Sequence, residues 1–263
     1  MIEYFIVFIF GAVIGSFLNV CIYRIPRGSS IVSPPSSCPD CGGKIRFYDN
    51  IPIISYIILG GRCRYCKSNI SIRYPVVEFI NAVLYTLILY RFGINNVYAL
   101  LVYFTFISSL VVITFIDLEF QIIPDRITIP GIPLSLIFGA TILPDPFFRY
   151  DLLGFKASLI GILSGGGLFY LIAVVGSAIF KQDAMGGGDI KMMAMIGGLL
   201  GWKGVIFTTF VGSLIGSIVG IIIFILKGRK RGIKIPFGPF LAIGAISSLL
   251  IGQEALYWYL YGG

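Results

Sequence analysis

The chain consists of long apolar runs separated by short polar stretches. Eight runs are apolar enough to predict helices, at residues 2–22, 76–92, 97–116, 127–143, 154–180, 190–202, 204–226 and 236–258. A helix that spans a bilayer needs roughly 20 apolar residues. The sixth run is shorter and rich in glycine, and we interpret it as a partial or tilted span. The pattern predicts an all-α polytopic membrane protein with about eight transmembrane helices.

The composition leads to the same class of protein. Hydrophobic residues make up 57% of the chain and charged residues 12%, with a mean hydropathy of +0.94. Soluble domains carry about 25% charged residues, so this chain cannot cover a water-soluble globule. The sequence contains no histidine, which excludes His-ligated metals and Ser-His-Asp or Cys-His catalysis. Hydrolysis would rely on carboxylates, on a metal held by cysteines, or on Ser and Lys.

The basic residues predict the orientation in the membrane. With eight spans, residues 24–74, 117–126, 181–189 and 227–235 share one side, and most of the 20 Lys and Arg residues lie there. Basic loops stay in the cytoplasm, so we expect this side to be cytoplasmic and both termini outside. We interpret the basic cluster at 227–234 as a topology signal, with binding of anionic lipid headgroups as the alternative. We expect no nucleic-acid partner.

Four of the five cysteines form two CxxC pairs, Cys38/Cys41 and Cys63/Cys66, in the one long polar loop. Two tight turns of this kind present four thiolates to a tetrahedral zinc ion. Cytoplasmic thiols stay reduced, which argues against disulfides. We therefore expect structural zinc that helps the loop to fold, with a redox pair or an iron–sulfur cluster as alternatives. Cys21 is expected to be a buried apolar residue.

These features predict three parts. Residues 1–23 form a first transmembrane helix, which we interpret as retained rather than removed as a signal peptide. Residues 24–74 form a cytoplasmic zinc-binding loop domain. Residues 75–263 form the transmembrane core, in which we expect the chemistry.

Carboxylates at the edges of the apolar runs are the candidates for chemistry, because membrane helices avoid acids that have no function. They are Glu78, Asp117, Glu119, Asp125 and Asp189. Asp117 ends the third run and Asp189 opens the sixth, so both lie on the same predicted side at similar depth. The two acids could therefore meet across the bundle.

Paired carboxylates can hydrolyse a peptide without histidine. Asp189 follows three glycines, in Met185-Gly-Gly-Gly-Asp189, which let a backbone or a substrate strand approach closely. Two adjacent carboxylates share a proton, so that one activates water and the other donates to the peptide carbonyl. Alternatively, Asp189 is only an N-cap and Asp117 a helix terminus, or the pair lines an ion pathway. Their place at the rim rather than at the midplane argues against transport.

Several stretches occur together in one order: Gly15-Ser-Phe-Leu-Asn-Val-Cys-Ile-Tyr-Arg-Ile-Pro26, the two CxxC pairs, Ile72-Arg-Tyr-Pro-Val-Val-Glu78, Ile116-Asp-Leu118 with Ile123-Pro-Asp125, and Met185-Gly-Gly-Gly-Asp-Ile-Lys191. Together they are highly specific, although a lone GxGD would not be. With them the sequence resembles, over nearly its whole length, the type IV prepilin peptidases. These are GxGD-type membrane aspartyl proteases, the prepilin leader peptidase/N-methyltransferase family.

The resemblance implies that Asp117 and Asp189 are the catalytic pair and that Glu119 and Asp125 lie outside it. It implies cleavage of the short basic leader of type IV prepilins or pseudopilins at the cytoplasmic face of the bacterial inner membrane. Members with two CxxC pairs are often bifunctional, so we also expect methylation of the new N-terminus from S-adenosylmethionine. No Gly-rich nucleotide loop marks a site for this donor, and residues of the first helix and the loop are only candidates.

Other interpretations stay open at this point. The stretch Ile235-Pro-Phe-Gly-Pro239 either offers backbone groups to an extended substrate or simply starts a helix. For Glu78 we expect a structural partner such as a buried Arg or Asn19. A presenilin-like protease and an ion-coupled transporter that uses the paired aspartates are alternatives for the whole protein. The loop could also be an assembly module that contacts a pilus or secretion machine.

Overall fold

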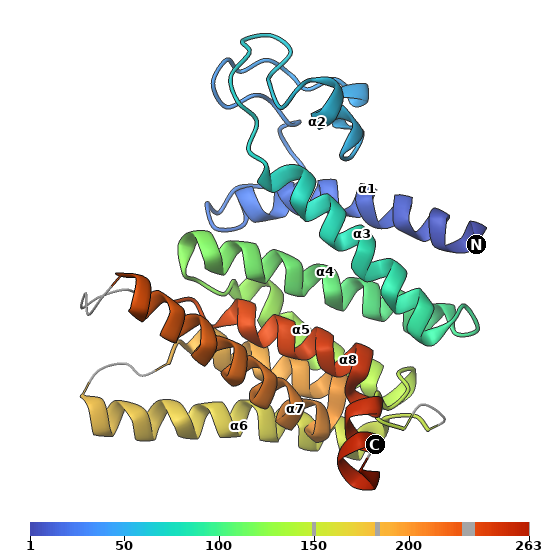
Figure 1. Cartoon of the computed structure of the whole chain (residues 1–263), viewed down its shortest axis with the longest axis vertical. Helices are drawn as coiled ribbons and strands as arrows, with labels where there is room; N and C mark the ends of the chain where they lie inside the picture. The colour runs from blue at the N-terminus through green and yellow to red at the C-terminus, as the bar shows by residue number, and fades with distance from the viewer. Residues whose placement is uncertain (149–150, 182–184, 228–234, 263) are drawn as a thin grey trace. The chain divides into compact units, whose positions relative to one another are not determined.

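The computed structural model describes residues 1–148, 151–181, 185–227 and 235–262, which are almost entirely helical (Figure 1). The elements are α1 (Ile2–Arg24), η1 (Phe47–Asn50), α2 (Ile54–Ile58), α3 (Arg73–Phe92), α4 (Val97–Phe120), α5 (Asp125–Thr141), α6 (Gly154–Phe180), α7 (Gly187–Lys227) and α8 (Gly238–Tyr261). Within the described part, α1, α3, α4, α6, α7 and α8 are long and apolar enough to cross a membrane. This confirms the predicted all-α membrane protein. Apart from Lys227, the basic cluster at 227–234 falls outside the described residues.

The element α7 contains two of the predicted runs. The backbone angles of Gly201 are φ 70° and ψ 178°, and these are not helical angles. A Cβ added at Gly197 would lie 2.9 Å from Cγ2 of Val205, although eight residues of continuous helix span about 12 Å. The chain therefore turns back at Gly201, and the two halves of α7 pack against each other.

The fourth predicted run forms α5, a helix of 17 residues that contains Pro130 and Pro133. It is shorter than each of the six helices that qualify as membrane spans by length and composition. When α5 and the two halves of α7 are included, each of the eight predicted apolar runs is helical.

The chain forms two compact units, Met1–Val112 and Ile113–Gly263. The first contains α1, the polar loop with η1 and α2, α3 and most of α4. The second contains the end of α4 and the helices α5 to α8. The sequence-based division at residues 23 and 74 stays a prediction.

In the second unit, glycines bring the helices into close contact. A Cβ at Gly161 of α6 would lie 2.0 Å from the carbonyl oxygen of Gly197. Ser158 of α6 donates a 2.7 Å hydrogen bond to the carbonyl oxygen of Gly198. On α8, a Cβ at Gly244 would lie 2.5 Å from the carbonyl oxygen of Thr208 in the second half of α7. In lipid, such small-residue packing and interhelical hydrogen bonds hold helices together, which explains the glycine-rich sixth run.

In the first unit, α1 and α3 pack in the same way. A Cβ at Gly15 would lie 2.6 Å from Cα of Glu78. The side-chain amide of Asn81 donates to the carbonyl oxygen of Gly11 at 2.8 Å, and that of Asn19 donates to the carbonyl of the first turn of α3 at 3.0 Å. These bonds fix the register of the two helices.

Candidate active site and metal centre

Asp117 lies in the last turn of α4 and is only 5% exposed. Its Oδ2 accepts a 3.0 Å hydrogen bond from the backbone N–H of Gly238, the first residue of α8. The first N–H groups of a helix have no partner within it and carry a partial positive charge. The start of α8 therefore supplies a donor to this buried carboxylate.

Only glycine fits at position 238 while this bond is kept. An added Cβ would lie 2.7 Å from Oδ2 of Asp117 and 3.4 Å from Cδ1 of Ile123. From the sequence alone, residues 235–239 are either a place for substrate pairing or a simple helix start, and neither interpretation includes the contact with Asp117. The only signal was a glycine directly before a proline at the start of an apolar run.

Asp189 lies in the first turn of α7, within the same unit as Asp117. Its backbone N–H donates to the carbonyl oxygen of Gly186 at 3.1 Å. Its Oδ1 is buried and has no hydrogen-bond partner. The two carboxylates lie close enough for their charges to interact. Asp117 and Asp189 thus lie in the same unit, and one buried oxygen of Asp189 is available for a further hydrogen bond.

The segment that follows α4 contacts the starts of both α7 and α8. A Cβ at Gly188 would lie 2.7 Å from Cβ of Ile123, and Ile123 also reaches Gly238. The glycines before Asp189 were expected to permit a close approach. At Gly188 the group that approaches is Ile123, which lies between the two helix starts next to the acids.

The other acids near this site are exposed. Asp125, the first residue of α5, forms a 2.6 Å ion pair with Lys191, two residues after Asp189. The side chains of Lys191 and Asp125 are 37% and 54% exposed, and such a pair contributes at most about 1 kcal/mol. Glu119 is exposed as well. Neither acid is buried as Asp117 is.

The two CxxC pairs come together in the loop of the first unit. The Sγ atoms of Cys38, Cys41, Cys63 and Cys66 all lie within 4.8 Å of one another. Those of Cys38 and Cys66 are 3.8 Å apart, and this is also the edge of a tetrahedron with Zn–S bonds of about 2.3 Å. The cysteines form no disulfide. The donor set and its spacing fit a tetrahedral metal ion.

The surroundings of two of the cysteines favour the thiolate form that binds metals. Backbone N–H groups of Cys41 and Asp40 lower the pKa of the Cys38 thiol to about 6. The hydroxyl of Ser68 lowers the pKa of the Cys66 thiol. At Cys41 the N–H of Gly43 acts in the same direction, but desolvation and the neighbouring thiols outweigh it and raise the pKa of that thiol to about 11. The turns therefore stabilise negative charge at Cys38 and Cys66, and a bound metal ion would be needed to hold Cys41 as a thiolate.

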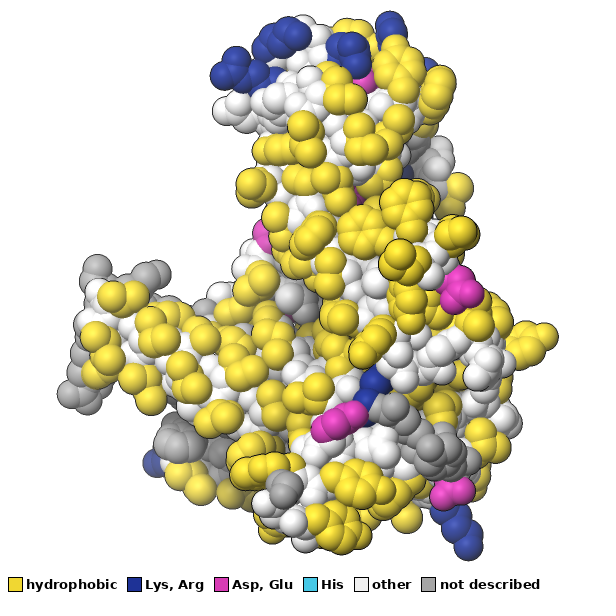
Figure 2. Space-filling view, turned by 45° about the vertical axis from the view of Figure 1, so that its right-hand side comes forward, with side chains coloured by type: hydrophobic (Ala, Val, Ile, Leu, Met, Phe, Trp, Pro, Cys, Tyr) yellow, Lys and Arg dark blue, Asp and Glu magenta, His cyan; other side chains and the backbone are white. Residues whose placement is uncertain are grey.

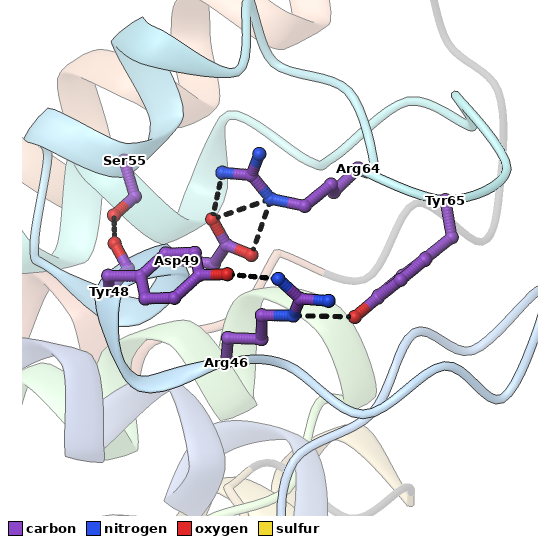
Figure 3. A network of polar contacts seen from close by, with 6 residues as sticks. All are labelled: Arg46, Tyr48, Asp49, Ser55, Arg64 and Tyr65. Atoms are coloured by element: carbon purple, nitrogen blue, oxygen red, sulfur yellow. Dashed lines mark hydrogen bonds and ion pairs between the residues drawn. The ribbon is translucent and has the colours of Figure 1, made fainter.

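A polar network connects the cysteine turns with η1 (Figure 3). Arg64, which lies between Cys63 and Cys66, bonds both carboxylate oxygens of Asp49, at 2.6 and 2.9 Å. Arg46 donates to the hydroxyls of Tyr48 and Tyr65. Residues from both sides of the loop thus hold η1 against the second cysteine pair.

Glu78 is a buried carboxylate of α3 that binds this loop. Its Oε2 accepts a 2.7 Å hydrogen bond from the backbone N–H of Ile53. The sequence predicted a structural partner such as a buried Arg or Asn19, but the side-chain amide of Asn19 donates to backbone carbonyls instead. A sequence pattern does not reveal a partner that is a backbone N–H far along the chain.

Two family models match the chain: the bacterial Peptidase A24 N-terminal domain over residues 9–92 and the type IV leader peptidase family over residues 104–221. The relatives include proteins named prepilin leader peptidase/N-methyltransferase. The one from Pseudomonas aeruginosa is 34% identical over 277 residues, covering 95% of this chain and 91% of that protein. The one from Neisseria gonorrhoeae is 34% identical, with 89% and 86% covered.

The protein of that name from Myxococcus xanthus is 38% identical over 222 residues, which cover 84% of this chain and 63% of the relative's length. No solved structure gives a significant match. The matching models cover both units, and the Pseudomonas relative aligns along nearly its whole length. The chain therefore belongs to the type IV leader peptidase family and is a membrane peptidase.

Proposed function

We propose that this protein removes the leader peptide of type IV prepilins or pseudopilins with Asp117 and Asp189 as the catalytic pair, and that it then methylates the new N-terminus. The name of the relatives supports the reaction class. The observation that supports the catalytic assignment is that both acids lie in one unit, where Ile123 contacts the glycine before Asp189 and the glycine that bonds Asp117.

The pair shares one proton, because two adjacent carboxylates do not both ionise readily. The ionised carboxylate takes a proton from water, and the water oxygen attacks the scissile carbonyl carbon. The protonated carboxyl donates its proton to the carbonyl oxygen. The tetrahedral intermediate then collapses: the carboxyl that took the proton from water gives it to the nitrogen as the C–N bond breaks. A hydroxyl of the intermediate returns its proton to the other carboxylate, so the pair again shares one proton. The N–H of Gly238 holds Asp117 during these steps.

The position of the pair suits a substrate of this kind. Asp117 ends one membrane helix and Asp189 begins another, at the edge for which the sequence predicts the cytoplasmic side. A basic leader stays in the cytoplasm, while the hydrophobic helix that follows it stays in the bilayer. The bond between them then lies at this rim of the inner membrane.

In this proposal Cys38, Cys41, Cys63 and Cys66 hold a structural zinc ion. Four protein ligands leave no open coordination position, so the metal stabilises the loop and takes no part in hydrolysis. The methylation follows from the second half of the relatives' name. S-adenosylmethionine would supply the methyl group to the α-amino group that cleavage releases.

The test is incubation of the purified full chain in detergent with a prepilin that carries its leader, with and without S-adenosylmethionine. Mass spectrometry should show loss of the leader and, only with the donor, one further methyl group. Intact prepilin after incubation with folded protein would contradict the substrate assignment. A cation flux in proteoliposomes that Asp117→Asn abolishes, without any cleavage, would favour the transporter instead.

A further inference from the structure

The segment from η1 to α2 lies beside the helices of its unit. The N–H of Ile53 bonds Glu78 at 2.7 Å, and Oγ of Ser16 lies 3.5 Å from Oδ1 of Asn50. Glu78 is five residues into α3, and Ser16 lies eight residues before the end of α1. At 1.5 Å per residue, these contacts lie about 8 and about 12 Å below the helix ends. Both helices qualify as membrane spans, so the segment reaches the level of the bilayer.

Figure 1 shows the same placement within the first unit, because α2 lies over the flank of α1 and not beyond its end. A polar loop that projected into the cytoplasm would contact only the last turn of α1 and the first turn of α3. The bond that Asn50 accepts from Ser16 and the bond that Ile53 donates to Glu78 therefore indicate a loop that folds back along the helices.

Apart from Asn50, the exposed side chains of this segment are apolar. Phe47, Ile54, Ile57 and Ile58 are 87%, 54%, 70% and 74% exposed. By contrast, the polar side chain of Ser55 is buried and donates a 2.8 Å hydrogen bond to the backbone of η1. A turn that faced water would carry the opposite pattern. Exposed apolar side chains of this size mark an interaction surface.

We propose that residues 47–58 lie in the lipid interface of the membrane, with Phe47, Ile54, Ile57 and Ile58 inserted between the lipids. Interfacial segments of this kind lie about 5–10 Å into the boundary between headgroups and acyl chains, which agrees with the depth of the Glu78 contact. The partner is thus the bilayer, and the loop that carries the cysteine cluster is attached to it.

The charge of the loop complements such a surface. Residues 24–74 contain eight basic and two acidic side chains, and anionic headgroups of the cytoplasmic leaflet attract basic segments. In Figure 2, basic side chains gather at the tip of the loop and apolar ones cover the part below. The loop therefore offers apolar groups to the acyl chains and positive charge to the phosphates.

Glu78 holds the segment at this depth. Ile53 has φ 62°, a conformation that β-branched residues rarely adopt, and its N–H points at the buried carboxylate of Glu78. Ser55 and Asp49 extend the support to η1 and the second cysteine pair (Figure 3). Glu78 is therefore a positioning residue of the loop. This role is separate from the proposed chemistry of Asp117 and Asp189.

Tryptophan scanning of the full chain tests this placement. In a Trp202→Phe, Trp258→Phe background, the protein with Ile57→Trp is placed in vesicles of phosphatidylcholine and phosphatidylglycerol. We expect a blue-shifted emission that brominated phosphatidylcholine quenches and aqueous acrylamide does not. The matched control is Val32→Trp, at a position of the same loop that is 87% exposed. Arg24 binds the carbonyls of Ser30 and Pro34, which keeps residue 32 level with the end of α1, and acrylamide should quench it.

Two outcomes would overturn the proposal. If acrylamide quenches Ile57→Trp as strongly as Val32→Trp, the segment lies in water. If neither quencher reaches it, protein covers the surface, either a second copy or another part of the chain.

The role of Glu78 is tested in the same Ile57→Trp protein. Glu78→Leu removes the acceptor for Ile53 and should reduce quenching by the brominated lipid, whereas Glu78→Gln keeps an acceptor and should retain it. Equal quenching in both variants would contradict the positioning role. No peptidase substrate enters either experiment, so the result does not depend on the proposed reaction.

Discussion

The first backbone N–H of α8, that of Gly238, donates a 3.0 Å hydrogen bond to the carboxylate of Asp117 in the last turn of α4. Two helices far apart in the sequence thus meet at one buried acid. The start of α8, which carries no acid of its own, becomes part of the proposed active site.

Gly238→Ala should therefore impair leader cleavage. The added Cβ would lie 2.7 Å from Oδ2 of Asp117, so the carboxylate or the helix start must move. Displacement of a catalytic group by about 1 Å can reduce the rate roughly 100-fold. We expect this loss in kcat, with KM little changed, in assays with a prepilin substrate.

Gly167→Ala is the matched control, since a Cβ at this helical glycine of α6 meets no atom within 4 Å. It should cleave at the wild-type rate. Equal kcat for Gly238→Ala and Gly167→Ala would show that the contact at Asp117 has no role in catalysis.

The cysteine cluster should hold metal independently of the acids. Cys38→Ser removes one of four thiolates, so the purified protein should lose most of its zinc in elemental analysis and unfold at a lower temperature. Leader cleavage per folded molecule should persist, because no hydrolytic step uses the metal. Cys21→Ala, at a cysteine outside the cluster, should keep its zinc. Undiminished metal in Cys38→Ser would exclude the four-cysteine site.

The ion pair of Asp49 with Arg64 gives a prediction for pH. Hydrogen bonds from Arg64 lower the pKa of Asp49 below its ordinary 3.8. The pair therefore contributes fully at pH values above 3.8, and the contribution is lost as the pH falls through the lowered pKa. Carbon-13 NMR of the carboxyl group should report the lowered pKa, and Arg64→Gln should return it towards 3.8. An unchanged pKa in that variant would contradict the assigned cause.

Much of this fold follows from local pattern. Each of the eight apolar runs is a helix, because backbone groups in a bilayer have no water to bond and a helix satisfies their hydrogen bonds within one segment. The CxxC spacing predicts the cysteine cluster, since each pair needs only its own tight turn. The direction of successive spans likewise predicts that Asp117 and Asp189 lie at one edge of the membrane, and the structure places both acids in the same unit.

The contacts that the sequence did not reveal involve backbone groups brought together by tertiary packing. The N–H of Gly238 bonds Asp117, and the N–H of Ile53 bonds Glu78. Every residue type except proline carries such a donor, so residue identity gives no signal for either contact. Only the small size of Gly238 pointed to a close approach.

The most direct test of the central claim is leader cleavage by Asp117→Asn and Asp189→Asn, with Glu119→Gln as the control at an exposed acid of the same helix as Asp117. Asparagine keeps the size of the side chain and removes the ionisable proton. The account predicts that both aspartate variants fold and leave the prepilin intact, while Glu119→Gln removes the leader as the wild type does. Leader loss at the wild-type rate in either aspartate variant would contradict it.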